Sequence, residues 1–116
     1  MTDSQVTVLM GTAQGQNHVF HADITDSAIG GGTFTALTDL ITSQGLQSLQ
    51  GQTITRVMAW TEGKIGQGAG ILIIDPQNTP LYSINCSRLE QVPPTWQTFN
   101  ISPQLNWVIQ AQTQAA

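Results

Sequence analysis

Two histidines and an aspartate fall within six residues, at His18, His21 and Asp23. Histidine serves both as a general base and as a metal ligand. A helix would place His18 and His21 on one face, where they could share a metal ion. This segment alternates apolar and polar residues like a β-strand, which separates the two imidazoles onto opposite faces and leaves Asp23 beside His21. We therefore predict neither a metal site nor a catalytic site here, with Asp23 placed to pair with His21.

The stretch GKIGQGAG, residues 63–70, holds four glycines and a lysine, a composition that suggests a phosphate-binding loop. Such a loop needs a helix directly after the glycines, because the helix N-terminus supplies free N–H groups to the phosphate. The apolar strand GILII follows instead, and Lys64 precedes most of the glycines. We predict a mobile connection between neighbouring antiparallel strands, able to become ordered on contact with a partner.

The remaining reactive side chains do not form a recognisable catalytic set. Cys86 is the only cysteine, which excludes an intrachain disulfide and predicts a small apolar packing residue. Glu62 and Glu90 are the only glutamates, and each has a basic residue two positions away. No G-x-S-x-G motif occurs. We predict no enzymatic activity, no cofactor and no metal.

Three tryptophans offer a different chemistry, because aromatic rings can stack on sugar rings as well as fill a core. Trp60 and Trp107 lie on largely apolar strand faces and are predicted to pack in the core. Trp96 follows two prolines and is predicted to lie at an edge or interface. If the chain binds carbohydrate, Trp96 and Tyr82 are the candidates for sugar stacking.

Charge is scarce in this chain: charged residues make up 9% of the sequence and the net charge is −4, against about 25% charged residues in typical domains. Gln and Thr, by contrast, occur fifteen times each. Three scattered cations, Arg56, Lys64 and Arg88, cannot form the basic surface that nucleic acid or an anionic membrane requires. The N-terminal residues lack the features of a secretion signal. We expect synthesis and folding in a cytoplasm, without direct contact to nucleic acid or membrane.

Short segments of β character recur along the chain and would position all of these residues. They are residues 5–10, 17–25, 33–38, 53–61, 70–74, 81–86, 96–101 and 105–112. Their number and spacing predict an all-β fold, an antiparallel β-sandwich or jelly roll of seven to eight strands. Residues 39–51 have roughly helical spacing and allow at most one short helix or a long loop. We predict a single domain over residues 1–116, with a possible N-terminal arm at 1–8 and a frayed tail at 113–116.

The second half of the chain resembles a known architecture. Its strands GQTITRVMAW, ILIIDPQNTPLYSI and PTWQTFNISPQLNWVIQA follow one another between Gly51 and Gln112. An apolar strand, a hairpin, a W-x-x-F strand and a closing strand in this order resemble jelly-roll modules of the carbohydrate-binding, galactose-binding-like type. The resemblance implies the sandwich fold, but no sugar-binding carboxylates or metal ligands map across.

The composition is also similar to that of small structural proteins of tailed phages, particularly head decoration (cement) proteins. This resemblance implies a non-enzymatic virion protein, assembled in the host cytoplasm, that bridges and stabilises major capsid subunits as a dimer or trimer. The alternative is a carbohydrate-binding module of a phage tail or receptor-binding protein. The predicted assembly contacts lie in the N-terminal segment and the glycine-rich loop: Thr2, Gln5, Val6, Val8, Lys64, Ile65 and Gln67.

Overall fold

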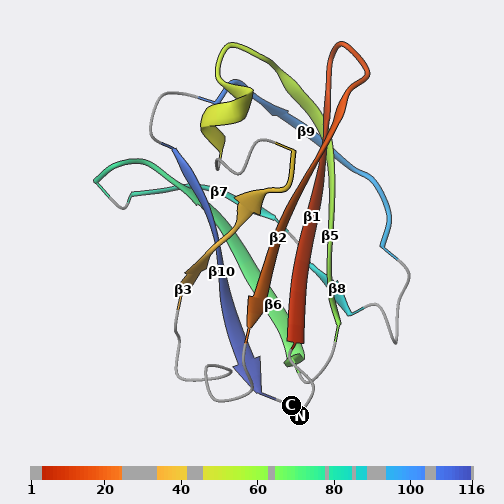
Figure 1. Ribbon diagram of the computed structural model, residues 1–116, viewed down its shortest axis with the longest axis vertical. Helices are drawn as coiled ribbons and strands as arrows, with labels where there is room; N and C mark the ends of the chain where they lie inside the picture. Colours follow the sequence, from red (N-terminus) through yellow and green to blue (C-terminus); the bar gives the residue numbers. More distant parts are fainter. Residues whose placement is uncertain are drawn as a thin grey trace.

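The computed structural model describes residues 4–24, 34–41, 46–62, 65–77, 79–84, 86–88, 94–103 and 107–115, which form two β-sheets packed face to face (Figure 1). Eight of the strands have three residues or more, which confirms the predicted all-β antiparallel sandwich and its strand number. The assignment to the jelly-roll class stays a prediction. The strands are β1 (Ser4–Thr12), β2 (Asn17–Ile24), β3 (Phe34–Ala36), β4 (Thr38–Asp39), β5 (Ile54–Glu62), β6 (Ile65–Ile74), β7 (Pro80–Ile84), β8 (Ser87–Arg88), β9 (Gln97–Ile101) and β10 (Val108–Ala115).

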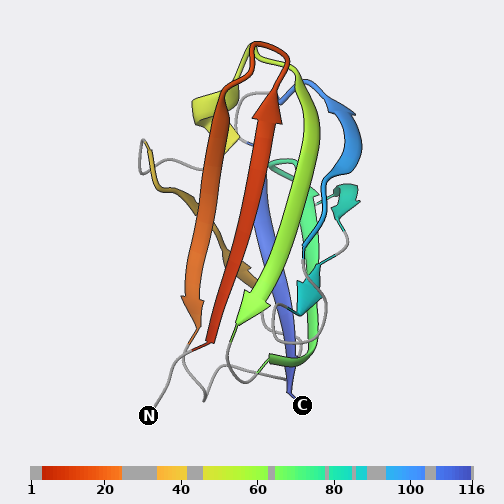
Figure 2. The same cartoon turned by 90° about the vertical axis from the view of Figure 1, so that its right-hand side faces the viewer.

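The two sheets differ in size and connection. Sheet A has the order β4-β2-β1-β5-β8, and β9 also pairs with β5; its pairs are antiparallel except for β5 with β8. Sheet B has the order β3-β10-β6-β7 and is antiparallel throughout. In Figure 2 the long strands β2, β1 and β5 of sheet A lie side by side toward the viewer, with β10 and β6 behind them. The chain passes between the sheets several times, so residues distant in sequence share one core.

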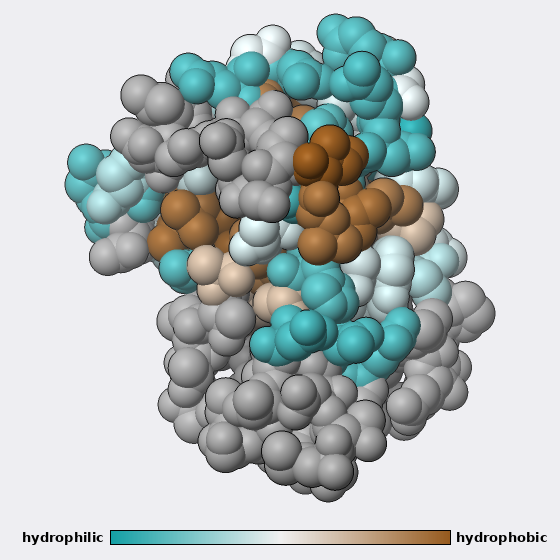
Figure 3. Space-filling view, viewed as in Figure 1, coloured by the Kyte–Doolittle hydropathy of each residue, from teal (hydrophilic) through white to brown (hydrophobic). Residues whose placement is uncertain are grey.

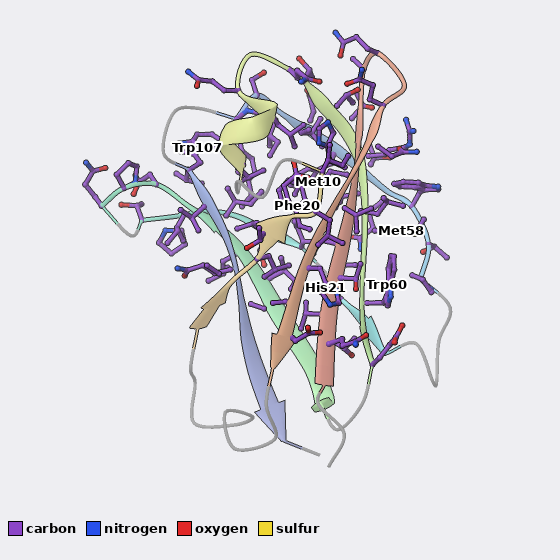
Figure 4. All side chains as sticks on the ribbon, viewed as in Figure 1. Met10, Phe20, His21, Met58, Trp60 and Trp107 are labelled. Carbon is purple, nitrogen blue, oxygen red and sulfur yellow. The ribbon has the colours of Figure 1, made fainter. Side chains whose placement is uncertain are left out.

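The core follows from alternation along the strands, because successive side chains point to opposite faces. On β1, Val6, Val8 and Met10 are completely buried, and Phe20 on β2 is equally buried. Met10 and Phe20 lie between the sheets in Figure 4. Both sheets contribute buried apolar side chains to a single cluster: Val6, Val8, Met10, Phe20, Ala22, Leu37, Leu46, Leu49, Ile54, Val57, Ala59, Ile71, Ile73, Ile84, Ile101, Ile109 and Ala111.

The prediction of a loose N-terminal arm is wrong for the residues that the structure describes. Strand β1 begins at Ser4 and lies in the interior of sheet A, paired with β2 on one side and β5 on the other. Val6 and Val8 are in the core and cannot be contact residues for a partner. Because both edges of β1 are already hydrogen-bonded, it cannot join a neighbouring sheet by strand addition.

The glycine-rich stretch is also ordered differently from the prediction. Strand β6 begins at Ile65, so most of the predicted loop lies within a ten-residue strand. Its early part pairs with the end of β10, with Gly70 opposite Gln112 and Ala69 opposite Thr113. The same pairing overturns the prediction of a frayed tail for residues 113–115, since β10 continues to Ala115. Glycine lacks the side chain that usually marks a strand, which explains why sequence pattern missed this pairing.

Two connections, the hairpin after β6 and the turn before β5, help to fix the strand positions. Asp75 Oδ1 accepts hydrogen bonds from the Gln77 and Thr79 amides at 3.0 and 2.8 Å, which closes the predicted hairpin between β6 and β7. Within the described part of the segment that allowed one short helix, a 3₁₀ turn spans Leu46–Leu49. No helix among the described residues is long enough and apolar enough to cross a membrane.

Candidate interaction surface

Strands β2, β1 and β5 present an ordered array of side chains on the face of sheet A that points away from the core. We call this array the outer face. The strand register places its residues in four rows: an acidic row of Asp23, Gln5 and Glu62; a tryptophan row of His21, Thr7 and Trp60; a methionine row of Val19, Leu9 and Met58; and an arginine row of Asn17, Gly11 and Arg56.

The two middle rows make the centre of the outer face substantially apolar. Leu9, Val19, Met58 and Trp60 are each half-buried, so their neighbours on the sheet cover them only in part. In Figure 4, Met58 and Trp60 lie on the far side of β5 from Met10 and Phe20. Among the described elements, none lies across β2, β1 and β5 on this side (Figure 2). The sheet therefore presents a broad apolar centre with polar residues at both ends of the strands.

The position of Trp60 corrects the prediction that it fills the core. The register shifts between Ile54 and Arg56, where β5 pairs with β9, so Ile54 and Val57 both point inward. From there Ala59 and Thr61 are buried and Trp60 points outward. A bulge of this kind inserts one residue and reverses the facing of the rest of the strand, and alternation read from Ile54 places Trp60 on the wrong face.

A chain of hydrogen bonds runs across the outer face through His21. The Thr7 hydroxyl lies 3.1 Å from His21 Nδ1, and His21 Nε2 lies 2.9 Å from Asp23 Oδ1. The predicted placement of Asp23 beside His21 is confirmed, as is the separation of His18 and His21 onto opposite faces. A hydroxyl, an imidazole and a carboxylate in sequence resemble the order of a nucleophilic triad. Acyl transfer also needs N–H donors for the oxyanion, and the amides around Thr7 are committed to the ladders with β2 and β5.

At the arginine row, a glycine allows the arginine to lie flat on the sheet. A Cβ on Gly11 would lie only 2.5 Å from Arg56 Cζ, so any larger residue would displace the guanidinium. Arg56 donates to Asn17 Oδ1 at 2.9 Å, and its Cζ lies 4.9 Å from the centre of the Trp96 ring. The guanidinium is thus held by a hydrogen bond on one side and a cation–π contact on the other.

Two exposed aliphatic residues extend the apolar centre beyond β2. Leu40 and Ile41, directly after β4, are 60% and 61% exposed. The Leu40 amide donates to the Val19 carbonyl at 2.8 Å, which fixes this turn beside the methionine row. Figure 3 shows apolar side chains gathered where β4 ends beside β2, with hydrophilic residues around them. Leu40 and Ile41 therefore continue the apolar part of the outer face toward the β4 edge.

The other histidine is part of a buried pair on the inner face. His18 Nδ1 lies 3.0 Å from Asp39 Oδ2, and Asp39 Oδ1 accepts a hydrogen bond from the Ile41 amide at 2.8 Å. The His18 side chain is 9% exposed and that of Asp39 is fully buried. A hollow of about 330 Å³, open to solvent, adjoins the pair and is lined by Gln16, Asn17, His18 and Ile41. The pair ties β2 to β4 and sets the turn that presents Leu40 and Ile41.

The aromatic residues proposed for sugar stacking lie in two different surroundings. Tyr82 is 37% exposed and packs against Phe99, with ring centres 5.7 Å apart, and against Trp107 at 6.1 Å. Trp96 is 43% exposed and contacts Arg56 at the margin of the outer face. Trp107 packs against the core as predicted, and so does Cys86.

Among the predicted assembly contacts that the structure describes, one residue lies on the outer face. Gln5 lies in the acidic row between Asp23 and Glu62. Ile65 and Gln67 belong to β6 of sheet B, while Thr2 and Lys64 lie outside the described residues. The outer-face residues of β2 and β1 could have been anticipated from alternation, whereas the bulge on β5 reverses the facing of its residues there. No single segment of the sequence indicates which strands lie side by side or in which register they pair.

Across the described part of the chain, no group of three or more His, Cys, Asp or Glu side chains is placed to hold a metal ion. Comparison with protein-family models, with curated proteins and with solved structures found no match for this chain.

Proposed function

We propose that this chain is a non-enzymatic virion structural protein, a capsid decoration (cement) protein of a tailed bacteriophage that acts as an oligomer. The observation that carries the proposal is the outer face, with its half-buried apolar centre and its hydroxyl and amide neighbours. Binding interfaces typically have an apolar, charge-depleted centre and a polar rim. The composition of the whole chain, with few charged residues, fits a role in a permanent assembly.

The proposed mechanism is multivalent contact with a lattice of major capsid subunits. Each copy contributes a modest interface, and a copy that touches two neighbouring subunits gains the effective concentration of a tethered second contact. Such bridging would stabilise the shell against internal DNA pressure without catalysis or cofactor. The proposed location is the virion, with assembly in the host cytoplasm and no direct contact to nucleic acid or membrane.

Capsid binding tests this function, and the chain offers a matched pair of variants. Leu9 is half-buried at the centre of the outer face, and Leu72 is half-buried on β6 of sheet B. The probe is a preformed shell of the major capsid protein of the phage to which this proposal assigns the chain, with binding measured by co-sedimentation. We expect saturable, stoichiometric binding that Leu9→Glu abolishes and Leu72→Glu preserves, because a carboxylate opposes burial of the outer face, whether a capsid subunit or a second copy in the bound oligomer covers it. Failure of the wild-type chain to bind such shells would reject the decoration role.

The second candidate is a carbohydrate-binding module of a phage tail or receptor-binding protein, favoured by the exposure of Trp96 and Tyr82. Arg56 contacts the Trp96 ring, as in sites where a polar group and a ring act together on one sugar. Titration with soluble sugars would quench tryptophan fluorescence under this alternative. Loss of that quenching in Trp96→Ala, with no binding to shells, would favour the module over the decoration protein.

A further inference from the structure

We propose that the outer face binds the outer face of a second copy of this chain, in a face-to-face dimer with two-fold symmetry. This inference deepens the proposed function by naming the surface and the partner for self-association, and it rests on that function for its biological role. A two-fold interface uses the same patch on both copies, so the patch must be complementary to itself. The four rows of the outer face meet this condition in charge and in side-chain type.

Charge is distributed asymmetrically along the strands. The acidic row carries Asp23 and Glu62 at one end of the array, and the arginine row carries Arg56 at the other end. A two-fold axis that runs across the strands, between the two middle rows, makes the strands of the two copies antiparallel. It places each Arg56 opposite Glu62 of the partner subunit, at both ends of the interface.

Both Arg56 and Glu62 can take part in such a contact. Arg56 carries five N–H donors, and Asn17 accepts from one guanidinium nitrogen. Glu62 is half-buried, and it forms no ion pair with any of the described residues. Oppositely charged groups facing one another across an interface fix its register and suppress other alignments. The contacts to Asn17 and Trp96 already hold the guanidinium, which lowers the side-chain entropy lost on binding.

The same symmetry brings the apolar centre together. Because β5 lies over β5, each Met58 faces Trp60 of the partner subunit, and each Leu9 faces Thr7 of the partner subunit. A thioether beside an indole ring is a favourable contact, and tryptophan is enriched among the residues that dominate binding energy. Antiparallel sheets pack face to face at a separation of about 10 Å, which leaves room for these side chains to interdigitate.

The size of the array sets the expected strength. Three strands spaced by about 4.8 Å, each with about eight residues rising about 3.3 Å, give a flat footprint on the order of 400 Å². Leu40 and Ile41 extend it at the β4 edge, and Trp96 extends it at the β9 edge. Standard interfaces bury about 800 Å² on each partner. We therefore expect a dimer that dissociates on dilution, with the capsid lattice supplying further stability.

Sedimentation velocity of the full chain from about 1 μM to about 1 mM measures the dimer directly. We expect a monomer–dimer equilibrium that weakens as salt is added, because the Arg56–Glu62 contacts lie at the ends of the interface. Arg56→Glu and Glu62→Arg should each weaken dimerisation at least tenfold, since like charges then face one another. The double variant Arg56→Glu with Glu62→Arg should restore dimerisation to within a few-fold of wild type.

Two variants keep the test independent of folding. Glu62→Arg breaks no side-chain hydrogen bond or ion pair within the described residues. Trp60→Ala should weaken dimerisation while leaving the far-ultraviolet circular dichroism spectrum unchanged. Leu72→Glu on sheet B serves as the control and should dimerise like wild type. A chain that stays monomeric at the highest concentration overturns the inference. Charge reversals without rescue, or a dimer lost in Leu72→Glu but kept in Trp60→Ala, overturn it equally.

The outcome separates this inference from the proposed function. A monomeric chain that binds capsid shells through Leu9 assigns the outer face to the capsid; it overturns the dimer and the oligomeric form of the proposed protein, and it leaves the decoration role standing. A dimer with the expected charge reversal and rescue, but without capsid binding, supports the dimer and rejects only the decoration role.

Discussion

Two histidine–aspartate pairs lie on opposite faces of sheet A. Each contains one histidine of β2, and the distance from imidazole nitrogen to carboxylate oxygen is nearly the same in both. His18 and Asp39 are 3.0 Å apart, and His21 and Asp23 are 2.9 Å apart. The first pair has side-chain exposures of 9% and 0%, whereas the second has 23% and 65%. The two distances are nearly equal, although His18 uses Nδ1 and His21 uses Nε2, and the surroundings of the two pairs differ.

This difference determines what each pair contributes. Water competes for the groups of the exposed pair and screens their attraction, so such a pair adds little stability. The buried carboxylate of Asp39 is shielded from water, and His18 and the Ile41 amide are among its partners. Removing one member of a buried pair therefore costs far more than removing one member of an exposed pair. The inner pair holds the fold together, while the outer pair shapes a surface.

The largest effect should come from breaking the inner pair. Asp39→Ala removes the acceptor for both His18 and the Ile41 amide, and we expect it to lower the free energy of unfolding by about 3–5 kcal/mol. Urea unfolding followed by circular dichroism measures this loss. A loss below about 1 kcal/mol would show that the inner pair is no more important than a surface contact.

Neighbouring residues on β1 extend the comparison from the histidine–aspartate pairs to apolar packing. Met10 is completely buried and Leu9 is half-buried on the outer face. Met10→Ala should cost about 2–5 kcal/mol because it leaves a cavity in the core, whereas Leu9→Ala should cost about 1 kcal/mol. Equal losses in the same unfolding experiment would mean that the two faces of sheet A are equally enclosed in solution.

Gly11→Ala sharpens the comparison at the outer face itself. The new Cβ would displace Arg56 from Asn17 and Trp96, and we expect a loss of roughly 1–2 kcal/mol together with a change in tryptophan fluorescence. Gly70 provides the matched control, because a Cβ there meets nothing within 4 Å. A Gly70→Ala variant that loses as much stability as Gly11→Ala would contradict a role for Arg56 in this difference.

The smallest effect should come from the exposed pair. Asp23→Ala is the same chemical change as Asp39→Ala, and we expect it to cost less than about 1 kcal/mol. Thermal unfolding of both variants under identical conditions compares the two losses of stability directly. If Asp23→Ala were as destabilising as Asp39→Ala, burial could not be what distinguishes the two pairs.

Alternation predicted much of the fold because it reports which side chains must leave water. Alternation correctly placed His18 and His21 on opposite faces of β2, and the structure shows that the face of His18 and Phe20 is the inner one. Alternation failed where the chain departs from it: the bulge on β5 reverses the facing of Trp60, and the glycines of β6 conceal a strand that pairs with β10. It also could not show that β1 is an interior strand, because edge and interior positions depend on partners supplied by other segments.

The sequence by itself determined the fold class, the separation of the two histidines and the hairpin at Asp75, since each depends on the preferences of residues close together in the chain. Only the tertiary structure decided that Asp39 pairs with His18 across twenty-one positions. It alone also decided that β2, β1 and β5 align their residues into four rows. Register between strands is set by the burial of the whole inner face at once, and the outer face takes its arrangement from that burial.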